Sequence, residues 1–156
     1  MTNHVEAHSR LRDAELERQR ARNLFALSDY PGATLHGQLC VEQSTKAVIA
    51  CFENPAHEHD CSRALFTVLA EHAAEIRERH GEDVLTRLRR LGIDTNSIAD
   101  WHERATYGED LPDGTHVSAA DLVTECDAQW AVALAERSCP TAREFVEAWV
   151  AAGTQG

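Results

Sequence analysis

The sequence is poor in lysine, in aromatic side chains and in long apolar runs. Only Lys46 is a lysine among its 15 basic residues, and 26 acidic residues bring the formal charge to −11. Binding to a nucleic-acid backbone rests largely on cations that displace counterions, so this charge argues against a general nucleic-acid binder. No window has the length of a membrane span, and the first residues contain no apolar run. We therefore expect no membrane partner and no secretory signal.

The cysteines do not form a pattern typical of a disulfide framework or a zinc ribbon. There are 5, an odd number, and none belongs to a C-x-x-C pair. Cys40 and Cys51 share one face of a predicted helix roughly 16 Å apart, which is too far for a disulfide. We expect reduced thiols and a cytoplasmic protein.

Several sequence motifs of enzymes and cofactor sites are also missing. The chain has no glycine-rich nucleotide loop and no Gly-x-Ser-x-Gly elbow. None of its glutamates is followed by histidine at the Glu-x-x-His spacing of di-metal helical bundles. No cofactor is expected.

What the sequence does contain is helical periodicity over most of its 156 residues. We predict an all-α fold, a single-domain helical bundle of about five main helices with an up-and-down core. The predicted helices cover about residues 5–28, 33–53, 60–79, 82–91 and 118–138, with a short one opened by the capping box at 141–144. The predicted stops are the turn at 29–32, Pro55, Gly81, Gly92 and Pro140. The bundle is thus expected over 5–138, with a short C-terminal helix and tail over 139–156.

The lone lysine stands four residues after Glu42 on the second predicted helix, between the apolar Leu39 and Ile49. Glutamate N-terminal to lysine at this spacing is the favoured order for an ion pair. One interpretation is a surface pair contributing a few tenths of a kcal/mol. The other is a pair at a dimer interface or cleft, where desolvation makes each charge costly without its partner.

The same helix carries a family resemblance. Val41, Glu42, Lys46 and Ala47 match an alanine-rich Val-Glu-Lys-Ala-x-Lys-Ala motif, and the His-Asp pair at 59–60 precedes the next helix. Together they resemble the HEPN (higher eukaryotes and prokaryotes nucleotide-binding) domain. Further along, Arg104 and Tyr107 resemble the Arg-x-x-Ala-x-Tyr or Arg-Tyr segment that precedes the final long helix in bacterial and archaeal members. The resemblance covers about residues 5–138.

The resemblance implies a helical bundle that forms homodimers and is often encoded beside a small nucleotidyltransferase as a toxin–antitoxin pair. Many members are metal-independent ribonucleases whose site combines an Arg, four to six residues of any kind, and a His. Such a site is chemically sensible, since His can move the 2′-hydroxyl proton and Arg can hold the phosphate. Here no arginine is followed by His at that spacing, and the positions after Arg104 are Glu109, Asp110 and Leu111. The resemblance therefore favours binding over cleavage.

The candidate site residues follow from these patterns. The predicted binding residues are Glu42, Lys46, Trp101, Arg104 and Tyr107. Trp101 and Tyr107 could equally anchor the irregular connector onto the bundle. Arg104 and His102 are the candidates for catalysis, if any occurs.

Residues 57–61 are a possible metal site, because five potential ligands follow one another there. His57 and His59 are its candidates. The preferred interpretation is a polar connector in which Asp60 caps the next helix, because alternate residues at a helix start rarely converge on one ion. No metal is predicted.

The leading functional hypothesis is a HEPN-like dimeric binding protein in a toxin–antitoxin or nucleotidyltransferase-associated system, which engages a protein partner or a nucleotide. The first alternative is a divergent metal-independent ribonuclease that recruits His102 or His59. The second is a helical scaffold without a nucleic-acid role, whose charge maintains solubility.

Overall fold

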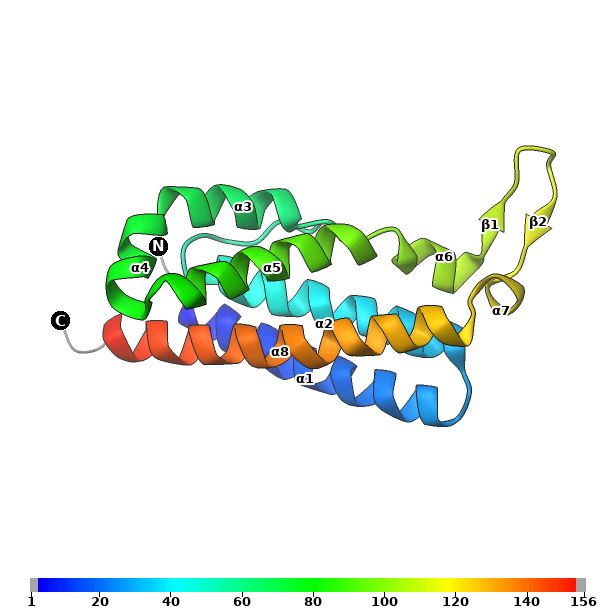
Figure 1. Cartoon of the computed structure of the whole chain (residues 1–156), viewed down its shortest axis with the longest axis horizontal. Helices are drawn as coiled ribbons and strands as arrows, with labels where there is room; N and C mark the ends of the chain where they lie inside the picture. The colour runs from blue at the N-terminus through cyan, green and yellow to red at the C-terminus, as the bar shows by residue number, and fades with distance from the viewer. Residues whose placement is uncertain (1–2, 154–156) are drawn as a thin grey trace.

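The computed structural model describes residues 3–153 and confirms an all-α bundle. Helices α1 (His4–Ala26) and α2 (Tyr30–Ala50) form a long antiparallel hairpin (Figure 1). The Asn3 side chain accepts a hydrogen bond from the Glu6 amide, and Asp29 accepts one from the Gly32 amide. Both helices therefore begin at side-chain caps of the preferred type.

Helix α2 lies at the centre of the bundle. It packs against α1, α5, α6 and α8, and most of its residues are buried. Gly37 allows the closest approach, because a Cβ at this position would lie 2.9 Å from the Ala131 backbone on α8. The nearly uniform apolar character of α2 in the sequence reflects this central position.

A connector over residues 51–61 leads to α3 (Ser62–Glu71), α4 (Ala73–His80) and α5 (Glu82–Ile98). The predicted stop at Gly81 is confirmed, but the stop at Gly92 is wrong, since α5 continues for six more residues. Gly92 is buried, and a Cβ there would lie 2.7 Å from the Phe66 ring on α3. Gly92 therefore serves helix packing and does not end the helix.

The irregular region contains α6 (Trp101–Tyr107) and a hairpin of β1 (Glu109–Asp110) with β2 (His116–Val117), which projects from the bundle in Figure 1. Residues 111–115 form the tip of this hairpin. Gly108 directly precedes β1 and has a φ of 80°. A Cβ at this position would lie 2.0 Å from the Val117 carbonyl oxygen. Only glycine fits this position without strain.

The last predicted helices differ from the observed ones. Ser118 caps only the four-residue α7 (Ala119–Leu122), and α8 (Glu125–Gly153) then runs without interruption through Pro140. The predicted stop at Pro140 is wrong, and the expected short C-terminal helix is the end of α8. Pro140 is exposed, whereas the following turns bury side chains in the core. These buried residues are Ala142, Phe145, Val146 and Trp149.

None of the helices described between residues 3 and 153 is long and apolar enough to cross a membrane. The architecture places α6 and the connector over the middle of α2, and this junction holds the candidate site.

Candidate functional site

The site is built on a buried ion pair. Lys46 Nζ lies 2.7 Å from Glu42 Oε1, and the two side chains are only 6% and 5% exposed. The interpretation as a surface pair is therefore wrong, since both charges lie inside the bundle of a single chain. Each charge is costly there without the other.

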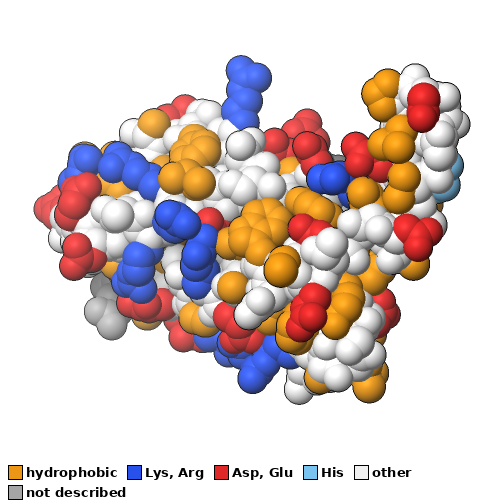
Figure 2. All heavy atoms as spheres, turned by 45° about the vertical axis from the view of Figure 1, so that its right-hand side comes forward, with side chains coloured by type: hydrophobic (Ala, Val, Ile, Leu, Met, Phe, Trp, Pro, Cys, Tyr) orange, Lys and Arg blue, Asp and Glu red, His pale blue; other side chains and the backbone are white. Residues whose placement is uncertain are grey.

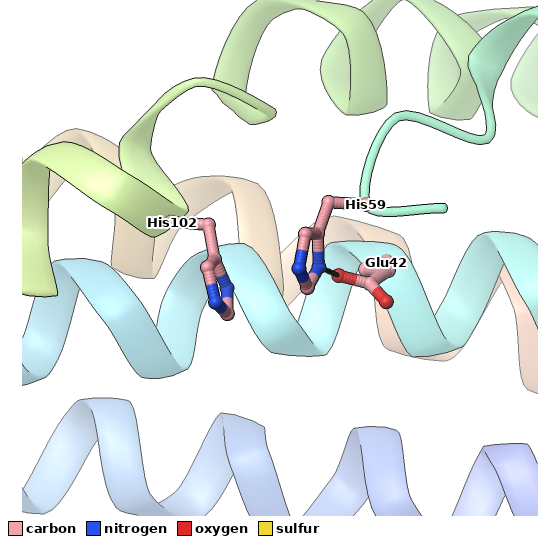
Figure 3. A group of neighbouring side chains, drawn as sticks. All are labelled: Glu42, His59 and His102. Atoms are coloured by element: carbon pink, nitrogen blue, oxygen red, sulfur yellow. Dashed lines mark hydrogen bonds and ion pairs between the residues drawn. The ribbon is translucent and has the colours of Figure 1, made fainter. Parts of the chain in front are cut away.

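The second carboxylate oxygen of Glu42 connects the pair to the surface. Oε2 accepts hydrogen bonds from Gln38 Nε2 and from His59 Nδ1, both at 3.0 Å. Gln38 Oε1 lies 3.2 Å from His102 Nδ1, so the network continues from α2 to α6. The rings of His59 and His102 stack with centroids 3.8 Å apart and planes inclined by 20°. Figure 3 shows both imidazoles beside α2, with His59 joined to Glu42.

The network also sets protonation states. Burial raises the pKa of the Glu42 carboxyl, but the hydrogen bonds from Lys46, His59 and Gln38 outweigh burial, so the pKa of Glu42 is lowered. Burial lowers the pKa of His102, and the neighbouring His59 lowers it further. At neutral pH this leaves an ionised Glu42 beside a neutral His102.

His59 and His102 open onto a pocket of ≈ 570 Å³ between the connector, α6 and the hairpin. Its charged lining is mainly acidic. The residues that line it include Asp60, Asp100, Glu103, Glu109 and Asp110, together with His116, Arg104 and Tyr107. Figure 2 shows acidic side chains gathered beside the projecting hairpin. The pocket therefore favours positively charged groups over phosphate.

Arg104 is already engaged inside this pocket. Its guanidinium lies 4.3 Å from the centroid of the Trp101 ring and forms an ion pair with Glu109 at 3.3 Å. Trp101 in turn packs edge-on against Trp130 of α8. Trp101 thus anchors α6 onto α8, which is one of the two roles considered for it from the sequence. Arg104 has less freedom to hold a phosphate than an unpaired arginine would have.

The predicted site residues thus divide into two groups. His102, Arg104 and Tyr107 line the pocket, and Tyr107 is 71% exposed. Glu42 and Lys46 lie beneath it and reach it only through hydrogen bonds.

Among the candidate metal ligands, His59 joins the network, whereas His57 lies exposed in the connector and outside the pocket lining. Asp60 accepts hydrogen bonds from the amide and hydroxyl of Ser62, but the N-cap of α3 is Cys61, so the predicted cap is wrong by one residue.

Sequence reasoning missed Gln38, which joins Glu42 to His102. Its i, i+4 spacing to Glu42 was the available signal, since residues at this spacing share a helix face. The proximity of His59 to His102, 43 positions apart, has no comparable signal, because it depends on how α6 packs on α2.

The fold is thus an all-α bundle in which the buried ion pair of α2 lies beneath the connector and α6. The model of the HEPN domain matches residues 7–148, and the chain belongs to the HEPN domain family. A comparison with curated proteins and one with solved structures each found no match.

Proposed function

We propose that this HEPN-domain protein is a binding module whose pocket receives a positively charged segment of a partner protein. The observation that carries the proposal is the lining of the pocket. It contains five carboxylates and one arginine, Arg104, which is paired with Glu109. Such a surface attracts lysine and arginine side chains and repels the phosphates of RNA or of a nucleotide.

The wider setting is a proposal that rests on the family. A second copy of this chain and a small nucleotidyltransferase are the partners proposed, within a toxin–antitoxin system. Light scattering at tens of micromolar should give the mass of a dimer, and the mass of a monomer would contradict the homodimer.

The pocket itself is tested with a fluorescent oligo-arginine peptide, followed by anisotropy at low and at physiological salt. The test variant carries Asp100→Asn, Glu103→Gln and Asp110→Asn. The matched control carries Asp13→Asn, Glu71→Gln and Glu78→Gln, three exposed acids on α1, α3 and α4. Both variants lose three negative charges, so any difference between them reports where the peptide binds.

We expect the pocket variant to bind the peptide roughly tenfold more weakly than the wild type, and the control to lose much less. Equal losses in the two variants would show that the peptide senses only the net charge, and the proposal would be wrong.

A divergent ribonuclease is the second candidate, favoured by one observation. His59, His102 and Arg104, the residues such an enzyme would recruit, all line the same pocket. A neutral His102 could act as a general base. This function requires RNA to enter against the acidic lining, which is why we place it second.

A further inference from the structure

We propose that Glu42, His59 and His102 bind one divalent transition-metal ion of the zinc class where the pocket meets α2. The potential ligand atoms of these three side chains all lie within 4.8 Å of one another. They come from three separate segments, α2, the connector and α6, so the cluster exists only in the folded chain (Figure 3).

The donor set selects the class of metal. Two imidazoles and one carboxylate form the three-ligand set of open zinc sites, in which water or a substrate completes the coordination. Imidazole suits Zn²⁺, Co²⁺ and Ni²⁺, whereas Mg²⁺ and Ca²⁺ take oxygen ligands. We therefore expect the site to discriminate strongly against Mg²⁺.

The surrounding hydrogen bonds are those that a metal site needs. His102 Nδ1 lies beside the Gln38 amide oxygen, which fixes the orientation of the ring. Lys46 holds Oε1 of Glu42, whereas Oε2 accepts from Gln38 and faces His59. Partners of this kind orient metal ligands and tune their affinity.

One rearrangement accompanies binding. Two nearly parallel stacked rings cannot both direct a nitrogen lone pair at one ion, so one of them must turn. His59 is free to do so, because its side chain is 53% exposed on a connector without helical structure. Glu42 Oε2 then exchanges the hydrogen bond from His59 for the metal, while Gln38 and Lys46 stay in place.

Electrostatics favour a cation at this point. Asp60, Asp100 and Glu103 line the same pocket as the two histidines, and the one lining arginine is paired with Glu109. The buried Lys46 opposes the cation, but Glu42 offsets its charge directly.

The test uses the full chain freed of metal with a chelator and titrated with Zn²⁺ by calorimetry. Co²⁺ is added in parallel, because its visible absorption separates nitrogen and oxygen ligands from thiolates. The variants are His59→Ala and His102→Ala. The matched controls are His57→Ala, from the same connector, and His116→Ala, from the pocket lining outside the cluster. Circular dichroism confirms that each variant is folded.

We expect one Zn²⁺ per chain and a loss of affinity of roughly tenfold or more in each test variant, with the controls unchanged. Excess Mg²⁺ should not compete. The absence of Zn²⁺ binding, binding that survives both substitutions, or a thiolate band with Co²⁺ would each overturn the proposal. The assay contains no partner, so its result is independent of whether the pocket binds a cationic peptide.

Discussion

At the scale of single residues, the buried pair of Lys46 and Glu42 connects stability to the site. Replacing Lys46 by Met leaves the Glu42 carboxylate buried without its cation, and removal of one partner from such a pair typically costs about 3 kcal/mol. We expect the free energy of unfolding of Lys46→Met, measured in urea, to fall by about that amount. Because the ammonium is buried, we expect Lys46→Met to affect folding more than partner binding.

The control for Lys46→Met is Arg87→Met, which breaks the exposed pair with Glu144 and should cost less than about 1 kcal/mol. The double variant Lys46→Met with Glu42→Leu should recover part of the loss, because no unpaired charge remains in the interior. Equal, small losses for Lys46→Met and Arg87→Met would mean that the buried pair is solvated.

His80 gives a second prediction at this scale. Burial, and then the adjacent Arg79, lower the pKa of His80 from its ordinary value of 6.5. Its ring packs against Phe145 and Trp149. Below pH 6.5 the unfolded chain binds this proton more readily than the folded chain does. The stability present above that pH is therefore lost as the pH falls toward the lowered pKa.

The measurement is the urea midpoint of the wild type and of His80→Phe, which keeps a ring but cannot be protonated, at about pH 7 and about pH 5.5. The wild type should lose more stability between these conditions than the variant. Identical losses in the two proteins would show that His80 stays protonated to the same extent in both states.

At the scale of elements, the close contact between α2 and α8 at Gly37 gives a prediction about helix packing. A Cβ at Gly37 would lie 2.9 Å from the backbone of Ala131, which cannot move aside. We expect Gly37→Ala to lower the free energy of unfolding by about 1–3 kcal/mol despite the better helix propensity of alanine. The comparison is Gly92→Ala, whose new methyl group meets the end of the partly exposed Phe66 ring.

Because Phe66 can turn toward solvent, Gly92→Ala should change stability by less than about 1 kcal/mol. Thermal or urea unfolding of the two variants measures the difference. An equal effect of both substitutions would show that α2 and α8 can separate as easily as a side chain can turn.

The same elements show what could be predicted from the sequence. Helical periodicity placed α1 and α2 closely, although residues 30–32 of the predicted turn already belong to α2. Gly81 correctly marked the break between α4 and α5. The helix ends predicted at Gly92 and Pro140 were wrong. Each residue is a local stop signal, but the residues that follow it are buried and keep the helix going. The Glu42–Lys46 pair was visible as an i, i+4 spacing, whereas its depth and its link to His102 depend on tertiary packing.

At the scale of the whole molecule, the feature that bears most on function is the acidic lining of the pocket between the connector, α6 and the hairpin. The chain has a formal charge of −11, and five of its carboxylates line the pocket that contains His59, His102 and Arg104. The chain has the HEPN fold, and acidic side chains line the pocket that contains His59, His102 and Arg104. This acidic lining is the reason we propose binding of a cationic partner as the function of the molecule.

The decisive measurement is RNA cleavage by the purified protein at neutral pH, once in the presence of a chelator and once with added Zn²⁺. The wild type is compared with Arg104→Ala and His102→Ala on the same structured and single-stranded RNAs. We expect that none of the three proteins degrades RNA faster than buffer alone. Cleavage by the wild type that disappears in both variants would contradict it and identify the pocket as a ribonuclease site.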